Sequence, residues 1–308
     1  MELAEKHNFP QIHALLTKYA SNLLENSGIQ GKINAVELYR KAGKSVEAAS
    51  ILTELATDAA TKGNLVRAKK FQVLAALEVE TFRQRTLNSN NNTGSMTTSQ
   101  GETKESKVGG PMTAQQTLAG LMTLETAVTS EGSVMANAKA MDNAWRGAEA
   151  YHFEILAHKL LYRNKIELAM ECAKELVQYD DILDPKRVYA LLALTAFYNE
   201  RFSSCSNAFV KLESLEGLSS EERRVYQNLA MSIFTQNHPS RHDHSDIEDR
   251  KRSKFGRQRL CIVSGRPLRV SKDDQVMACK RCRHFAFESE IVHFKTCVLC
   301  HAPVSSFR

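Results

Sequence analysis

Apolar side chains recur every three or four residues along the first part of the chain, which is the spacing of one face of an α-helix. Four such runs cover residues 12–24, 33–42, 45–60 and 64–82. Gly43 and Gly63 separate the later runs, as is usual where helices end. Strand-like alternation is nearly absent, so we predict a stack of helical hairpins over residues 1–87.

The helical spacing returns after residue 142 and repeats with a period of 36 residues. This period is close to that of tetratricopeptide repeats and lies within the range of helical solenoids. We therefore predict an all-α, tetratricopeptide-like solenoid of helical hairpins over residues 1–87 and 112–237, followed by a small C-terminal module whose two Cys-x-x-Cys pairs make it zinc-ribbon-like. The matching positions are Tyr162, Ile166, Ala173 and Leu176 in one copy and Tyr198, Phe202, Phe209 and Leu212 in the next.

Helix caps and aromatic side chains support this interpretation. Three pairs have the spacing of residues at a helix start, namely Asn164 with Glu167, Asp184 with Pro185 and Ser219 with Glu222. The aromatic residues recur at helical spacing, and we expect them to pack between hairpins rather than to form a cofactor site. They are Trp145, Tyr151, Phe153, Tyr162, Tyr189, Phe197, Tyr198 and Phe209.

Two polar segments interrupt the pattern. Residues 88–111 are rich in Asn, Ser, Thr and Gly, so they cannot bury enough apolar surface to offset the entropy of ordering, and we predict a flexible insertion. A weakly specified helix is expected near residues 118–129. Residues 238–259 predict a basic flexible linker that leads to a zinc-binding module over residues 260–308. We expect this linker to keep the module apart, so that the module serves assembly and not the folding of the helices.

Charge and composition exclude several classes of protein. With 308 residues, 43% of them hydrophobic, the chain can build a sizeable core. No apolar run is long enough to cross a bilayer and no signal peptide is recognisable, so we expect a cytosolic setting. Residues 241–308 hold 15 Lys and Arg against 8 Asp and Glu, whereas the rest of the chain holds 26 against 27. The basic excess is therefore local, and a solvated linker is its simplest interpretation.

Cysteine spacing carries the clearest chemical signal. The sequence Cys279-x-x-Cys282 is followed, after fourteen residues, by Cys297-x-x-Cys300. Each pair fits a tight turn that can direct two thiolates at one Zn²⁺ ion, and four thiolates complete a tetrahedral site. With no position left for water, such a zinc is structural and not catalytic. We predict these four cysteines as the zinc ligands.

Other side chains near the cluster are weaker candidates. The stretch that begins at Cys261 resembles a third cysteine turn in which Ser264 replaces the second cysteine, and we interpret Cys261 as a packed thiol. His284, His293 and His301 are more typical of surface groups or of groups behind the ligands. Whether Cys261, His293 or His301 binds metal stays open at this point. His301 directly follows a ligand, so it is the first reserve.

Several segments resemble a known family of transport proteins. They are residues 35–43 (AVELYRKAG), 145–153 (WRGAEAYHF), 191–194 (LLAL) and 218–221 (LSSE), together with the arrangement from Cys261 to Cys300. This set is similar to the C-terminal region of a WD-repeat subunit of intraflagellar transport complex A. The resemblance covers nearly the whole chain except residues 88–111.

The resemblance implies a non-catalytic scaffold whose partners are other complex A subunits and, indirectly, ciliary membrane-protein cargo. It implies roles in retrograde ciliary transport, cilium assembly and ciliary entry of membrane proteins, with locations in the cilium or flagellum, the basal body and the cytoplasm. Family members also carry two N-terminal propellers that have no counterpart here, so we expect a C-terminal fragment. The family's zinc cysteines map onto Cys279, Cys282, Cys297 and Cys300.

Two other functions remain as alternatives. A nucleic-acid-binding zinc protein would use the basic linker, and its binding would depend steeply on salt. A ubiquitin-ligase-type module would need eight ligands for two zinc ions, and this tail offers five cysteines and scattered histidines. No set of nucleophile, base and orienting group suggests an enzyme. We therefore predict no enzymatic activity and no nucleic-acid partner.

Overall fold

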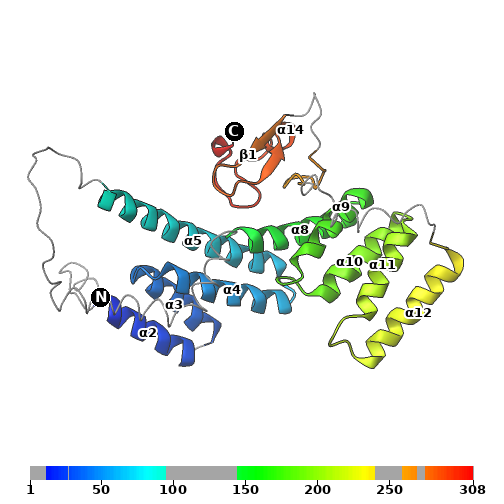
Figure 1. The fold of residues 1–308 in the computed structure, drawn as a ribbon, viewed down its shortest axis with the longest axis horizontal. Coiled ribbons are helices and arrows are strands. Elements are labelled where there is room, and N and C mark those ends of the chain that lie inside the picture. Colours follow the sequence, from blue (N-terminus) through cyan, green and yellow to red (C-terminus); the bar gives the residue numbers. More distant parts are fainter. Residues whose placement is uncertain (1–11, 27, 95–143, 240–258, 269–274, 308) are drawn as a thin grey trace, which may run out of the picture. The chain divides into compact units, whose positions relative to one another are not determined.

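The structure is a computed structural model that describes residues 12–26, 28–94, 144–239, 259–268 and 275–307. The chain divides into two compact units. The first unit comprises Met1–Asp58 and Leu74–Ala144, and the second comprises Ala59–Val73 and Trp145–Arg308. Within the described residues both units are mainly helical, and the second also holds a small module with a two-stranded sheet (Figure 1).

The four apolar runs of the N-terminal part fold as helices. They are α2 (Ile12–Asn26), α3 (Ile29–Lys41), α4 (Ser45–Thr61) and α5 (Leu65–Gly94). Helix α5 runs beyond Phe82 into the segment that we expected to be a flexible insertion. The rest of that insertion, the expected helix near residues 118–129 and most of the expected linker lie outside the described residues.

The first unit is held by small apolar side chains and a few polar contacts. Ala20 and Ala35 are fully buried, so α2 and α3 pack closely. The Tyr39 hydroxyl lies 3.1 Å from the Ser21 hydroxyl. Glu78 on α5 is nearly buried and is paired with Arg40 at 2.7 Å between Oε1 and Nε.

The second unit contains consecutive antiparallel helices, each of which packs on the next (Figure 1). They are α8 (Arg146–Tyr162), α9 (Ile166–Leu176), α10 (Pro185–Tyr198), α11 (Phe202–Glu213) and α12 (Ser220–Gln236), with a short 3-10 turn, η1 (Val177–Tyr179), after α9. The 36-residue repeat therefore relates the pair α8 and α9 to the pair α10 and α11. The predicted all-α hairpin fold is confirmed.

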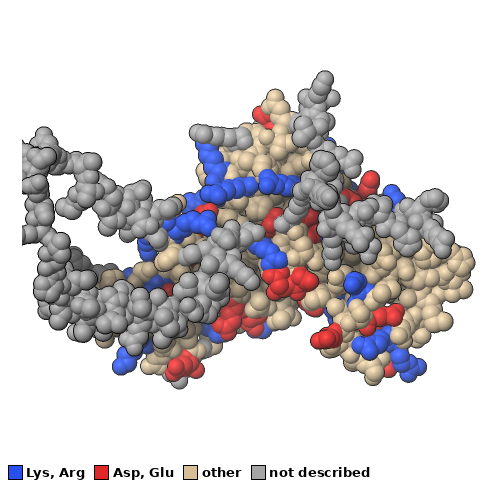
Figure 2. Space-filling model, in the orientation of Figure 1, with Lys and Arg blue, Asp and Glu red and all other residues tan. Residues whose placement is uncertain are grey.

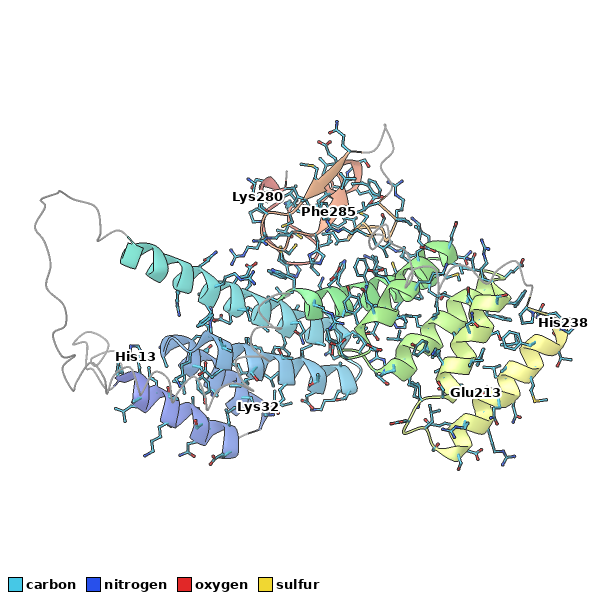
Figure 3. All side chains as sticks on the ribbon, in the orientation of Figure 1. His13, Lys32, Glu213, His238, Lys280 and Phe285 are labelled. Carbon is cyan, nitrogen blue, oxygen red and sulfur yellow. The ribbon has the colours of Figure 1, made fainter. Side chains whose placement is uncertain are left out.

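The positions that recur in the repeat differ in their burial. Leu176 and Leu212 are at most 1% exposed and form equivalent parts of the core between hairpins, where side chains fill the space (Figure 3). Tyr162 and Tyr198 end their helices and are 94% and 56% exposed. The expectation that all the aromatic residues pack between hairpins is therefore wrong for these two tyrosines, because the last residue of a helix can point into solvent.

One turn geometry closes four of the helices. In each turn, one residue has a left-handed backbone, and two N–H groups beyond the helix donate to carbonyls of its last turn. At the end of α8, for example, the Asn164 N–H donates to Leu161 O at 3.0 Å and the Lys165 N–H donates to Leu160 O at 2.9 Å. The left-handed residues are Gly43, Gly63, Asn164 and Glu200, with φ of 75°, 77°, 57° and 56°.

This turn corrects one predicted cap and leaves two confirmed. Asn164 does not cap α9, because it is the left-handed residue that ends α8, and the N-cap of α9 is Lys165 without a side-chain bond. Asp184 caps α10 by accepting from the Lys186 N–H at 3.1 Å. Ser219 and Glu222 form the predicted capping box of α12.

The C-terminal module is built on one short hairpin. Strands β1 (Val276–Ala278) and β2 (Phe285–Phe287) are antiparallel, with Ala278 opposite Phe285. A four-residue helix, α14 (Glu288–Ile291), follows, and a 3-10 turn, η3 (Val304–Ser306), lies near the end. In the part of the chain that the structure describes, no helix is both long enough and apolar enough to cross a membrane.

Candidate metal centre

The four predicted cysteines come together inside the module. Their Sγ atoms all lie within 4.8 Å of one another, and all four residues are buried. The Sγ atoms of Cys279 and Cys300 are 3.6 Å apart, and those of Cys282 and Cys297 are 3.8 Å apart. A tetrahedral ion with Zn–S bonds of about 2.3 Å requires sulfur atoms about 3.8 Å apart, so the arrangement fits zinc.

Two loops with the same backbone carry these ligands. We number the loops of the module in chain order, with residues 261–266 as the first loop, residues 279–284 as the second loop and residues 297–302 as the third loop. In the second loop the Arg283 N–H donates to Cys279 O at 2.8 Å, and the Cys279 N–H donates to His284 O at 2.9 Å. The third loop repeats both bonds, and each loop has a left-handed residue directly after its second cysteine. Each loop therefore presents its two sulfur atoms on one side.

The cluster is chemically suited to bind a cation. Metal binding requires thiolates, and a buried thiol normally resists ionisation. Hydrogen bonds from Cys282 and Cys300 lower the pKa of Cys297, whereas the bond to Cys297 raises the pKa of Cys282, so Cys297 is the thiol of this pair that loses its proton first. Ser306 Oγ lies 3.8 Å from the Cys279 sulfur, and the Lys280 N–H donates to Ser306 O, which holds η3 over the second loop.

The module is tied to the helices of its own unit by a partly buried chain of hydrogen bonds. Lys69 on α5 donates from Nζ to Val298 O in the third loop at 2.6 Å and lies 3.1 Å from Nδ1 of His152 on α8. The other ring nitrogen of His152 donates to Ile262 O of the module at 2.7 Å. The imidazole is thus neutral, with its proton on Nε2.

Burial dominates the titration of both bridging groups. It lowers the pKa of Lys69 to about 8, an effect that the negative charges of Cys297, Cys300 and Cys282 partly oppose. It also lowers the pKa of His152 to about 3, helped by the neighbouring Lys69 charge. Sequence reasoning singled out neither residue, although His152 lies within the WRGAEAYHF segment.

The three histidines near the cluster are not among the side chains that converge in it. His284 lies with Nδ1 at 2.8 Å from Cys282 O and with Nε2 at 3.3 Å from Glu149 Oε1 on α8, which adds a further contact to the helices. His301 is the left-handed residue of the third loop, with φ of 59°. Neither these two nor His293 belongs to the set of side chains that converge in the described residues. The buried Cys261 lies outside that set as well.

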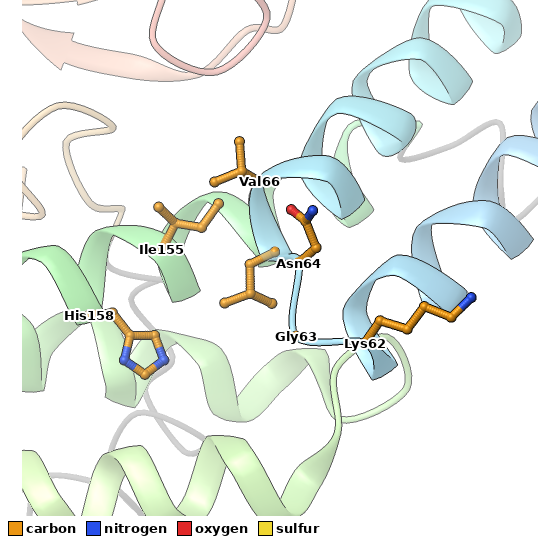
Figure 4. A pocket seen from close by; sticks show the side chains of 7 residues that line it. Lys62, Gly63, Asn64, Val66, Ile155 and His158 are labelled. Carbon is orange, nitrogen blue, oxygen red and sulfur yellow. The ribbon is translucent and has the colours of Figure 1, made fainter.

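A hollow of about 460 Å³ lies where the start of α5 meets α8 (Figure 4). Its lining combines apolar side chains with one ammonium and one imidazole group, and it is open to solvent. This lining does not combine a nucleophile, a base and an orienting group, so the hollow is no candidate for a catalytic site. The lining residues are Lys62, Gly63, Asn64, Leu65, Val66, Ile155 and His158.

Basic side chains are prominent on the module. Lys280, Arg281, Arg283 and Lys295 all belong to its described surface, and in the space-filling view Lys and Arg gather beside it (Figure 2). Acidic side chains are interspersed over the helices in the same view. The module therefore presents a cationic surface next to its thiol cluster.

Fold and site together define a helical-repeat protein with a C-terminal zinc-finger domain. Family models match three parts of the chain and agree with this description. "WD repeat-containing protein 35, TPR repeats" matches residues 10–81, "IFT121-like, TPR repeats" matches residues 142–241, and "IFT121, second zinc finger domain" matches residues 259–305.

Similar proteins carry the same name in three mammals. WD repeat-containing protein 35 from Homo sapiens, Rattus norvegicus and Mus musculus is in each case 37% identical to this chain over 306 residues. The alignment covers 99% of the chain and 24% of each relative. The chain belongs to the WD repeat-containing protein 35 family and spans about a quarter of the length of these relatives.

Proposed function

We propose that this chain is a non-catalytic scaffold of intraflagellar transport complex A, with a structural zinc ion held by Cys279, Cys282, Cys297 and Cys300. The observation that carries the proposal is the combination of hairpin repeats with a converging four-thiol cluster, in an order that matches the three family models. Stacked hairpins offer extended side surfaces for partner proteins, which suits a scaffold.

The zinc would have a structural role. Four thiolates close its coordination sphere and leave no place for a reacting water. The module has three-residue strands and a four-residue helix, so it has little regular structure to hold its shape without the ion. The metal would thereby fix the loops that carry Val298 and the cationic side chains around them.

The partners we propose are other subunits of complex A, with ciliary membrane-protein cargo reached indirectly. The corresponding locations are the cilium or flagellum, the basal body and the cytoplasm. Through the complex, the chain would support retrograde ciliary transport, cilium assembly and entry of membrane proteins into the cilium. This part of the proposal is supported by the family membership.

The test combines metal analysis with affinity purification from ciliated cells. We expect one zinc per intact chain and co-purification of transport subunits. The double variant Cys279→Ser, Cys282→Ser should lose the zinc and at least part of the subunits. A matched control, Lys280→Ala with Arg281→Ala, changes the two residues between these cysteines and should keep the metal.

The outcomes separate the proposal from its alternatives. Recovery of nucleic acid in place of transport subunits, with a steep loss at raised salt and in the Lys280→Ala, Arg281→Ala control, would favour the nucleic-acid alternative. A chain that holds no zinc would refute the metal assignment. Two zinc ions per chain would favour the ubiquitin-ligase type of module.

A further inference from the structure

A further loop in the module has the backbone of the two ligand-bearing loops. In this first loop, residues 261–266, the Gly265 N–H donates to Cys261 O at 2.9 Å and the Cys261 N–H donates to Arg266 O at 2.8 Å. Gly265 has φ of +74°, like the left-handed residues that follow the second cysteine of the other loops. Cys261 and Ser264 thus stand at the two ligand positions of this loop.

The chemistry at those positions differs from that of a zinc site. A serine hydroxyl is not among the usual zinc ligands, which are thiolates, imidazoles and carboxylates. The Cys261 thiol donates to Glu290 Oε2 on α14 at 2.9 Å. The other oxygen of Glu290 is paired with Arg266 Nε at 3.1 Å. The carboxylate is therefore engaged on both oxygens by groups of the module itself.

We propose that the first loop is a zinc knuckle that holds no metal and that it anchors the module on helices α8 and α9. The Cys261–Glu290–Arg266 network stands where an ion would otherwise hold the loop. The Arg266 guanidinium, which also lies 4.1 Å from the centre of the Phe287 ring, supplies the positive charge that an ion would bring.

The state of the Cys261 sulfur agrees with a site without metal. Burial and the hydrogen bond to Glu290 both raise the pKa of Cys261, so the sulfur is a neutral thiol at physiological pH. This thiol has a carboxylate as its hydrogen-bond acceptor, whereas the sulfur atoms of the four-cysteine cluster face one another. The Val263 N–H approaches the same sulfur at 3.4 Å, which completes the contacts of the loop without any ion.

The tip of the first loop is its docking surface. A Cβ atom on Gly265 would overlap the Sγ atom of Cys172 on α9 and would lie 3.3 Å from Leu160 Cδ1 on α8. Only glycine allows this approach, and it also allows the left-handed backbone of the turn. Next to the tip, Ile262 is 1% exposed, and its carbonyl accepts the bond from His152. The first loop thus packs closely against helices α8 and α9.

Metal stoichiometry tests the first half of the proposal. Native mass spectrometry of the full chain should show one zinc in the wild type and one zinc in Cys261→Ser. Two zinc ions in the wild type, with one lost in Cys261→Ser, would overturn the proposal. Absence of zinc from both would refute the four-cysteine site of the proposed function but would leave a metal-free first loop intact.

Thiol labelling tests the anchor. Cys172 is fully buried beneath the loop tip, so its alkylation should be slow in the wild type. We expect Gly265→Ala to accelerate alkylation of Cys172 about tenfold or more by lifting the module locally, while the chain still binds one zinc. Peptide mapping distinguishes Cys172 from the other cysteines.

Gly217→Ala is the matched control. Gly217 also has a left-handed backbone, with φ of +92°, but a Cβ there would meet nothing within 4 Å. It should therefore introduce the same backbone strain and leave Cys172 protected. Equal labelling of Cys172 in Gly265→Ala and the wild type would overturn the anchor. Equal acceleration in both glycine variants would do so too, because backbone strain alone would then explain the effect.

Discussion

The helical hairpins and the C-terminal module reach a defined structure by different routes. In the hairpins, one local turn is used four times, and buried leucines such as Leu176, Leu192 and Leu212 recur along the second unit. In the module, the strands are three residues long, and what converges is four sulfur atoms. Periodic packing can therefore be predicted from sequence, whereas the convergence of four thiols depends on contacts between distant loops.

Loss of the proposed zinc should have the largest effect and is the most severe test of this comparison. We expect Cys282→Ser to unfold the module and to leave Lys69 and His152 without their carbonyl partners. A buried polar group without a partner costs about 1–3 kcal/mol, so α8 should also lose stability. Hydrogen exchange measures both effects, on the amides of the module and on those of α8.

Cys205→Ser is the control for this variant. Cys205 is buried in α11 and lies outside the four-thiol cluster, so its replacement should leave zinc content and the module unchanged. If Cys282→Ser left the amides of α8 as protected as before, the helices would be independent of the module, as the linker composition suggested.

A core truncation in the hairpins should be nearly as costly but confined to the helices. Leu192 on α10 is 1% exposed, and Leu192→Ala should lower the free energy of unfolding by about 2–5 kcal/mol. Leu194, two residues away on the same helix and 43% exposed, gives a control that should change stability far less. Thermal or urea unfolding measures both, and comparable losses would contradict the assignment of the core.

The sequence predicted the hairpins well because their determinants are local. The 36-residue spacing correctly related Leu176 to Leu212, and the capping box at Ser219 was found from two residues. The error at Asn164 has a physical cause, since asparagine is favoured both as an N-cap and in the left-handed backbone that ends a helix. Local rules alone could not decide between these two positions.

The candidate site was predictable only in part. The Cys-x-x-Cys spacing indicates a tight loop, so the convergence of four thiols could be expected from the sequence. The bonds of Lys69 could not, because its partners His152 and Val298 lie 83 and 229 positions away in the chain. A half-buried lysine in a helix has no signature in the sequence, because its burial arises only from the folded arrangement.

Acid should weaken the contact between the C-terminal module and helix α8 by an intermediate amount. The pKa of His152 falls from 6.5 to about 3 on folding, because the buried ring resists protonation. Its contribution is fully present above about pH 6.5 and is lost as the pH falls toward 3. At pH 5 the loss amounts to about 2 kcal/mol, from 1.5 units at 1.36 kcal/mol each.

Urea unfolding of the zinc-loaded chain at pH 7.5 and pH 5 measures this loss. His152→Gln provides the comparison, because its amide can donate to Ile262 O but does not titrate. The variant should lose less stability between the two pH values than the wild type. Metal content must be followed in parallel, because protons also compete for the thiolates. Equal losses in both proteins at constant zinc content would show that His152 does not carry the effect.

The smallest expected effect is a gain in stability from a substitution in a hairpin turn. Glu200 has φ of 56°, a left-handed backbone that costs a residue with a side chain about 1–2 kcal/mol. Glycine avoids this cost but loses some of the gain through its greater freedom when unfolded. Glu200→Gly should therefore stabilise the second unit by about 0.5–1 kcal/mol.

Asn164→Gly, at the equivalent turn 36 residues earlier, should gain less stability, because asparagine already tolerates this backbone. Unfolding curves of the two variants decide the point, and a loss of stability in Glu200→Gly would show that its side chain contributes more than its backbone costs.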